Sequence, residues 1–310
     1  MYRVRGANAL WHHDGNEKLK PWGFYIHGLV DGFSRLIIYL ICCNNKRAAT
    51  VENIFMTEAV GKYGWPSRVR GDYGKENNGV ERRMIQRRGR EHHPYLRGRC
   101  VMRVATGFSY LLTMALRSTQ NIRMERNWRD VRRDTIQLFR EIFQHLESTG
   151  LLDMGNAIER VCLFLVFLPR IQASLNETRD SWNLHKLRTE HCQTPQAIYE
   201  LSRTKAIRAG YWPDPGDDAA LAVQPEYGVD EEAPAPPADE LAHDPNSNEG
   251  EQPNDAESQR DAGIFVTDDG ELEAMQAILG DFDFTEEDGN FGIDVYCRAV
   301  ELATAHFLSA

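Results

Sequence analysis

Residues 9–71 carry a pattern of apolar runs that restricts the fold more than any other feature of the chain. The runs predict strands over 10–14, 22–31, 35–43 and 67–71, with a helix over 50–63 before the last strand. The third run, RLIIYLICC, is apolar almost throughout, which is typical of a strand buried on both faces. Three strands in a meander, followed by a helix, a strand and further helices, indicate a mixed α/β layer fold.

The rest of the first two thirds of the chain is mainly helical in pattern. A basic helix is predicted over 81–90, and longer helices over roughly 119–148 and 156–182. Another helix begins after Thr194, because Pro195 fits the first turn of a helix. We therefore expect a core over 1–150 and a helical extension of it over 151–210.

Charge divides the chain into a basic body and an acidic tail. Residues 1–210 contain 34 Lys and Arg against 20 Asp and Glu, whereas residues 211–310 contain 2 against 26. A basic body suits a polyanionic partner such as DNA, although solvated arginines on helix faces also explain the charge.

The tail itself has two parts. Residues 211–262 have too few large apolar side chains to bury a core and are expected to form a disordered acidic linker. This linker could compete with DNA for the basic body. Residues 263–310 predict a small helical segment, either a weakly stable subdomain or an element that binds a partner or inhibits the protein.

The cysteines and the apolar runs limit the cellular setting. None of the six cysteines has C-x-x-C spacing, and no spacing resembles a zinc site. They indicate thiols in a reducing compartment, so we expect a nuclear or cytoplasmic protein. No apolar run is long enough to predict a membrane span.

Three acids occupy positions that suit metal-dependent phosphoryl transfer. Asp14 ends the first predicted strand, Asp72 follows the fourth, and Glu125 lies in a predicted helix. Hard cations such as Mg²⁺ prefer carboxylate oxygens on rigid elements. Two such ions about 4 Å apart can hold the attacking and leaving oxygens of a phosphodiester. Taken singly, Asp14 and Asp72 could equally be turn or cap residues, since a glycine stands near each.

Five motifs follow one another in an order that argues against turns and caps. They are WHHD at 11–14, VDGFSR at 30–35, GDYGKEN at 71–77, NIRMER at 121–126, and WNLHKLRT at 182–189 with the later Thr194-Pro195. In this order they resemble the catalytic core of retroviral integrases and DDE transposases. The similarity is greatest to integrase-core-domain proteins of fungal and other eukaryotic transposable elements, and it spans about residues 8–200.

The resemblance implies a fold, a site and partners. It implies a ribonuclease-H-like mixed five-stranded sheet flanked by helices, followed by the helical extension and the disordered acidic tail. Asp14, Asp72 and Glu125 would be the catalytic acids and would bind two Mg²⁺ or Mn²⁺ ions, while Asp31 would be structural. DNA would be the partner, and the active form a homo-oligomer. The candidate DNA contacts are Arg82, Arg83, Arg87, Arg88, Asn121, Arg126 and Arg129, although the arginines could pair with nearby acids instead.

The spacing of the acids departs from the family pattern at one place. Fifty-two residues separate Asp72 from Glu125, more than the resemblance implies. The excess is close to the 18 residues of 100–117, which are largely apolar and directly precede the catalytic helix. We infer an insertion, with a retained intron as the hypothesis for its origin. A transcript that joins Arg99 directly to Ser118 would support that hypothesis, and uniform read coverage would exclude it.

Three functions remain compatible with the sequence. The first is DNA integration or transposition by a two-metal DDE site. The second is a catalytically inactive, host-adopted protein that binds DNA or acts as a scaffold. The third is a metal-dependent nuclease of the same fold that hydrolyses DNA without joining it.

Overall fold

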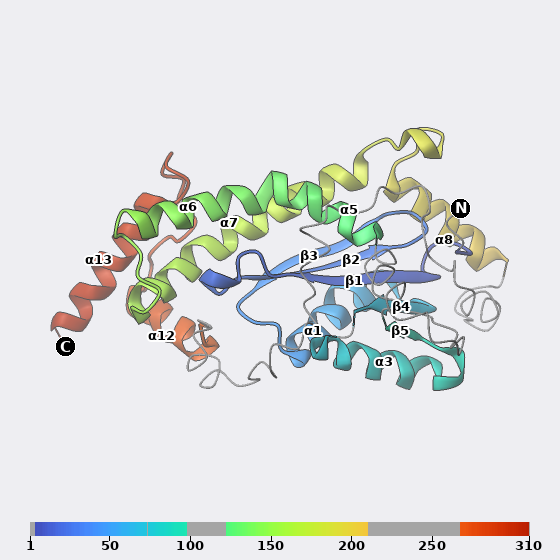
Figure 1. Cartoon of the computed structure of the whole chain (residues 1–310), viewed down its shortest axis with the longest axis horizontal. Helices are drawn as coiled ribbons and strands as arrows, with labels where there is room; N and C mark the ends of the chain where they lie inside the picture. Colours follow the sequence, from blue (N-terminus) through green and yellow to red (C-terminus); the bar gives the residue numbers. More distant parts are fainter. Residues whose placement is uncertain (1–3, 73, 98–121, 210–266, 310) are drawn as a thin grey trace, which may run out of the picture.

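The computed structural model describes residues 4–72, 74–97, 122–209 and 267–309. At its centre is a mixed sheet with the strand order β3-β2-β1-β4-β5, shown in Figure 1. The strands are β1 (Leu10–Asn16), β2 (Tyr25–Asp31), β3 (Ile37–Cys43), β4 (Arg68–Gly71) and β5 (Tyr95–Arg97). β2 is antiparallel to β1 and β3, whereas β4 is parallel to β1 and β5. The predicted ribonuclease-H-like arrangement is confirmed.

The structure differs from the predicted strands mainly at β5 and at the start of β2; in addition β1 continues to Asn16 and β3 begins at Ile37. The sequence did not locate β5, which has only three residues and so shows no alternating pattern. The second strand begins later than predicted because Lys20–Trp22 forms a 3-10 turn. Gly23 ends this turn with a φ of 79°, a conformation that glycine adopts without strain.

Helices cover both faces of the sheet. On one face lie α1 (Ala48–Ile54), which continues through a π-helical turn into α2 (Gly61–Tyr63), and α3 (Asn78–Arg88). Over the other face run α5 (Ile122–Val131), a second π-helical turn, α6 (Gln137–Ser148) and the long α7 (Ala157–Leu184), as Figure 1 shows. The start of the predicted 119–148 helix lies outside the described residues. Within the described ranges, none of the helices has the length and apolar character needed to cross a membrane.

The sheet separates two hydrophobic cores. Strand residues such as Ile26, Val30 and Leu40 pack against α5, α6 and α7. Their neighbours along the same strands, including Leu29 and Tyr39, pack with α1 and α3 on the opposite face. This alternation follows from the two-residue period of a strand, and it explains why β2 is buried along its whole length and β3 is apolar along its whole length.

α8 (Pro195–Arg208) closes the end of the sheet at which β1 begins. The side chain of Thr194 caps this helix by accepting a hydrogen bond from Ala197 N at 3.1 Å, and Pro195 stands in the first turn, as predicted. Tyr199 is buried and donates its hydroxyl to Asn8 Oδ1 at 2.8 Å. The helical extension is therefore bound directly to the segment before β1.

The C-terminal helices share a hydrophobic core with α7. α12 (Asp269–Leu279) and α13 (Ile293–Ser309) contribute buried side chains to the α7 side of the molecule. Arg170 of α7 donates to the backbone carbonyls of Phe284 and Glu286. At the other end of the segment, Asn44 Nδ2 donates to Thr267 O at 2.9 Å. The linker predicted over 211–262 lies outside the described residues.

Side-chain amides of α7 bond to the outer strand β3. Gln172 accepts from Cys42 N at 3.0 Å and donates to Leu40 O at 2.9 Å. Asn183 accepts from Ile37 N at 2.9 Å and donates to Ile37 O at 2.9 Å. Each amide therefore replaces the backbone bonds that a neighbouring strand would make.

Asp31 has the structural role expected from the resemblance. Its carboxylate accepts hydrogen bonds from Asn8 N, Ser34 N and Ser34 Oγ, each at 2.7 Å. Asp31 is fully buried, and these bonds join the turn after β2 to the segment before β1. The VDGFSR motif thus specifies a turn rather than a ligand.

Candidate active site

Asp14 is placed by β1 and held by a hydrogen bond from α5. Its Oδ2 accepts a hydrogen bond from Trp128 Nε1 at 2.8 Å, and its Oδ1 accepts one from Gly15 N at 3.0 Å. Trp128 belongs to α5, so this contact fixes the helix above the strand that carries the acid. The side chain of Asp14 keeps partial access to solvent.

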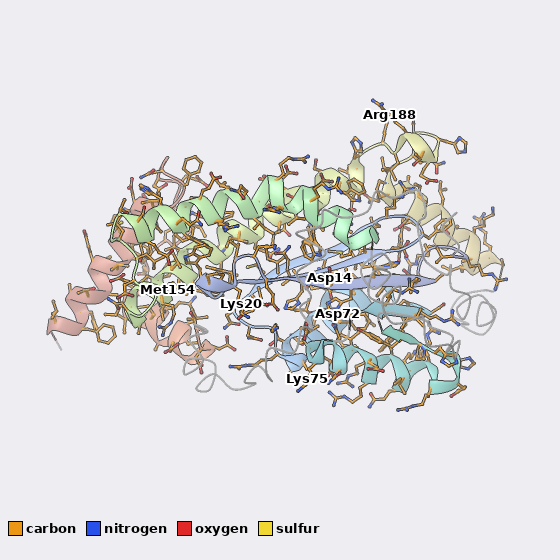
Figure 2. The ribbon with its side chains drawn as sticks, in the orientation of Figure 1. Asp14, Lys20, Asp72, Lys75, Met154 and Arg188 are labelled. Atoms are coloured by element: carbon orange, nitrogen blue, oxygen red, sulfur yellow. The ribbon has the colours of Figure 1, made fainter. Side chains whose placement is uncertain are left out.

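Asp72 directly follows β4, the strand parallel to β1. Its Oδ1 accepts hydrogen bonds from Gly74 N at 3.0 Å and from Asn77 Nδ2 at 2.5 Å. Because parallel neighbours end at the same edge of a sheet, β1 and β4 bring the two acids together, and Figure 2 labels both near the centre of the molecule. The structure therefore places Asp14 near Asp72, and their role as catalytic metal ligands stays a prediction.

The electrostatics of the two acids reflect this proximity. Burial, with repulsion from Asp72 as the second cause, raises the pKa of Asp14 to about 7. Burial also raises the pKa of Asp72, although its hydrogen bonds oppose the change. Two carboxylates that repel each other in a partly buried site favour a proton or a cation between them.

α5 carries Glu125 into the same region. Glu125 lies between Met124, which is buried, and Trp128, which contacts Asp14. Met124 packs against Gly28 of β2, and Gly28 is the residue paired with Asp14 across the β1–β2 ladder. The backbone of α5 therefore passes close to Asp14 at the level of Glu125, whose side chain lies outside the described residues.

The close approach of α5 requires a residue without a side chain at position 28. A Cβ there would collide with Met124 Cε and would lie 3.1 Å from Trp128 Cη2 and 3.2 Å from Leu40 Cδ2. We expect Gly28→Val to lower the free energy of unfolding by about 1–3 kcal/mol, measured by urea denaturation. Because the main collision is with the end of one flexible side chain, Gly28→Ala should cost less when combined with Met124→Ala than the two separate changes predict.

Gly15→Ala supplies the matched control for this prediction. Gly15 also lies in the sheet, yet a Cβ there would meet only His27 Nδ1, at 3.8 Å. The control should therefore cost less than Gly28→Ala. Additive effects of Gly28→Ala and Met124→Ala would contradict the proposed close approach.

The motif after Asp72 contributes a further acid to which the sequence analysis gave no role. Glu76 is half buried, and burial followed by repulsion from Asp72 raises its pKa. Glu76 also contributes to the raised pKa of Asp14. The positive charge of Lys46, which pairs with Glu17 at 2.7 Å, partly opposes the rise in the pKa of both Asp72 and Glu76. In the sequence, the position of Glu76 four residues after Asp72, within the GDYGKEN motif, could have indicated that it lies near the site.

The donor chemistry of the site fits a hard divalent cation. Asp14 and Asp72 offer carboxylate oxygens from two rigid strands, which are the ligands that Mg²⁺ and Mn²⁺ prefer. Among the residues that the structure describes, no three His, Cys, Asp or Glu side chains form a complete metal site. The third predicted ligand, Glu125, has its side chain outside that set.

Among the candidate DNA contacts that the structure describes, three arginines of α3 bond to other parts of the fold. α3 carries Arg82 and Arg83, which both bond to Glu52 of α1, at 2.9 and 2.6 Å. Arg88 donates to the carbonyls of Trp65 and Pro66 at 3.1 and 3.0 Å, which ties α3 to the segment before β4.

Two of the remaining candidates, Arg87 and Arg129, are described by the structure. Arg87 on α3 and Arg129 on α5 are exposed, and Figure 1 shows these two helices on opposite sides of the sheet. Asn121 and the side chain of Arg126 lie outside the described residues. DNA contact by these seven residues stays a prediction.

Two histidines are buried behind the site. His13 and His27 stack with ring centroids 6.2 Å apart, and burial lowers the pKa of each to about 4. In the unfolded chain each histidine has its ordinary pKa of 6.5, so as the pH falls the unfolded chain gains the proton before the folded protein does. As the pH falls from about 6.5 to about 4, each histidine therefore favours unfolding by about 1.4 kcal/mol per pH unit.

This effect can be isolated with His27→Gln. The raised pKa of Asp14 acts in the opposite direction over part of this range, so the pH dependence of the wild-type protein is mixed. The difference between the wild-type and variant free energies of unfolding should fall by about 1.4 kcal/mol per unit between pH 6.5 and 4, measured by urea denaturation. A difference that does not change with pH would contradict a neutral buried His27.

Comparison with known proteins gives one family and several structural neighbours, two of which are described here. A family model described as the integrase core domain matches residues 1–106 and 100–209. The HTLV-2 integrase catalytic core domain in complex with magnesium is 14% identical, with a TM-score of 0.37, over 64% of this chain and 99% of that one. The catalytic core domain of BIV integrase is 15% identical, with a TM-score of 0.38 and the same coverage. No curated protein sequence matches the chain.

Proposed function

Because this chain belongs to the integrase core domain family, we propose that it cuts and joins DNA by two-metal phosphoryl transfer. The observation that carries the proposal is the pair formed by Asp14 and Asp72. The two acids come from separate strands, lie close enough to repel each other, and have raised pKa values. Because two neighbouring carboxylates with raised pKa values destabilise a fold, their presence in one place favours a site that binds a cation between them.

The residues of the chain have distinct parts in this proposal. Asp14, Asp72 and Glu125 would hold two Mg²⁺ or Mn²⁺ ions, with Asp14 shared between them. The ions would activate water or a DNA 3′-hydroxyl and stabilise the leaving oxygen. Trp128 fixes one oxygen of Asp14, and Asn77 fixes one oxygen of Asp72. Exposed arginines such as Arg129 would contact DNA phosphates, which gives affinity without sequence readout.

The segment before α5 bears on whether this site is complete. The two matches to the family model meet between residues 100 and 106, at the start of the predicted insertion over 100–117. The second match also covers residues 100–117, so the insertion stays a proposal; it would separate Glu125 from the other two acids along the chain. Full activity would then require that α5 still carries Glu125 to the site. Separately, we propose that the active form is a homo-oligomer.

The proposal is tested by a cleavage and strand-joining assay on the terminal-repeat DNA of the source element, with Mg²⁺ or Mn²⁺. We expect the wild-type chain to cut and join, and Asp72→Asn to lower the rate by about a thousandfold or more, because a metal ligand is lost. Asp180→Asn is the matched control, because Asp180 is 60% exposed on α7 and pairs only with its neighbour Arg179 among the described ion pairs. Equal activity of Asp72→Asn would refute the site. Cleavage without joining would indicate a nuclease, and a salt-sensitive gel shift without turnover would indicate a scaffold.

A further inference from the structure

A chain of buried polar side chains runs from β1 to the second acid. His13 Nδ1 lies 2.8 Å from Asn77 Oδ1, and Asn77 Nδ2 donates to Asp72 Oδ1 at 2.5 Å. Both linking residues are almost completely inaccessible, with 1% of His13 and 2% of Asn77 exposed. His13 is the immediate neighbour of Asp14, so this chain connects the two catalytic strands beneath the site.

The direction of the hydrogen bonds follows from the chemistry of the groups. An ionised carboxylate only accepts, so the amide nitrogen of Asn77 must face Asp72 and the amide oxygen must face His13. Since that oxygen also only accepts, the His13 ring must carry its hydrogen on Nδ1. The network therefore specifies one orientation of the amide and one tautomer of the imidazole.

These contacts determine how the Asp72 carboxylate is turned. Its Oδ1 takes hydrogen bonds from both Gly74 N and Asn77 Nδ2. Two donors on one oxygen restrict rotation of the carboxylate and direct the other oxygen away from the Gly74–Asn77 turn. A ligand carboxylate held in this way binds a cation without first losing rotational freedom.

We propose that Asn77, itself oriented by His13, is a positioning residue that turns Asp72 toward the cation of the active site. The inference rests on the function proposed above, and it adds two residues to the machinery. Asn77 acts through Asp72 and touches neither DNA nor the reacting atoms. The buried amide is suited to this part because it accepts from one partner and donates to the other at the same time.

Mn²⁺ affinity of the full, DNA-free chain tests the proposal, measured by electron paramagnetic resonance. Asn77→Leu keeps the volume but removes the donor, and we expect it to weaken Mn²⁺ binding by about tenfold or more. His13→Leu should weaken binding in the same direction. His13→Asn should restore it, because the amide nitrogen of the new side chain can replace the Nδ1 donor. Rates at saturating Mn²⁺ should fall less than rates at limiting Mn²⁺, which a general loss of folding would not produce.

A second measurement does not depend on catalysis. In the metal-free wild-type protein, ¹⁵N NMR of the His13 ring should show the Nδ1–H tautomer. An Nε2–H tautomer, or unchanged Mn²⁺ affinity in Asn77→Leu, would overturn the positioning role while leaving the proposed function intact. Wild-type protein that binds Mn²⁺ with the expected variant pattern but neither cuts nor joins DNA would overturn the function alone. Wild-type protein that binds no Mn²⁺ would overturn both.

Discussion

Asp14→Asn should abolish metal-dependent cutting and joining and, in the metal-free protein, should raise stability. The rate should fall by about a thousandfold or more, about 4 kcal/mol of transition-state stabilisation, because the shared carboxylate ligand is lost. Stability should rise because burial and Asp72 hold the pKa of Asp14 at about 7, well above its ordinary value. Above that pH the folded state therefore contains an unfavourable charge. The substituted amide keeps an oxygen that can accept from Trp128.

The size and the pH range of the stability gain follow from this shift. A raised carboxyl pKa destabilises the fold increasingly as the pH rises from about 4 to about 7, and the whole cost is present above pH 7. Because Asp14 keeps partial solvent access, screening should limit the gain to about 1–2 kcal/mol at pH 8. Thermal melting in a chelator measures it, with Asp180→Asn as the control. A less stable Asp14→Asn variant would contradict the repulsion between the acids.

Removal of residues 263–310 should unfold the protein. The C-terminal helices contribute five buried side chains to the core on α7, and these are Met275, Val295, Tyr296, Ala299 and Ala303. At about 1.5–3 kcal/mol for each large apolar side chain, the loss approaches the whole stability of a typical domain. Soluble yield and urea denaturation of the truncated chain measure the effect.

The matched variant replaces only residues 211–262 with a flexible linker of equal length. It keeps Thr267, the two helices and the Arg170 contacts, so its free energy of unfolding should stay within about 1 kcal/mol of the wild type. A stable, soluble 1–262 fragment would contradict the shared core. This variant is also the proper test of competition between the acidic linker and DNA, because deletion of the whole tail would remove part of the core.

The features that the sequence predicted correctly are those set by local pattern. β1, β2, β3 and β4 have alternating or continuous apolar runs. Asp14, within β1, and Asp72, just after β4, converge because the two strands are parallel neighbours in which His12 pairs with Arg70. Thr194 and Pro195 mark the start of α8 through capping chemistry that involves only neighbouring residues. These parts need no knowledge of distant contacts.

The features that the sequence missed depend on contacts between distant residues. The stripe Val295, Ala299 and Ala303 predicts a helix with a narrow buried face, but not that α7 lies against it. From the sequence, Asn77 is expected to be a turn residue; its contact with His13 of β1 depends on the fold. β5 is defined by its pairing with the edge of β4, and its three residues are too few to show an alternating apolar pattern.

The amides of Gln172 and Asn183 have a consequence for assembly. Protein chains often associate by adding a strand to an unprotected sheet edge, which also makes such edges prone to aggregation. At Ile37, Leu40 and Cys42 the outer backbone groups of β3 are already bonded to α7, so another chain cannot extend the sheet there without displacing a helix. Any oligomer that the active protein forms must therefore use surfaces other than this edge. Replacing both amides with leucine would turn a protected strand into a template for self-association.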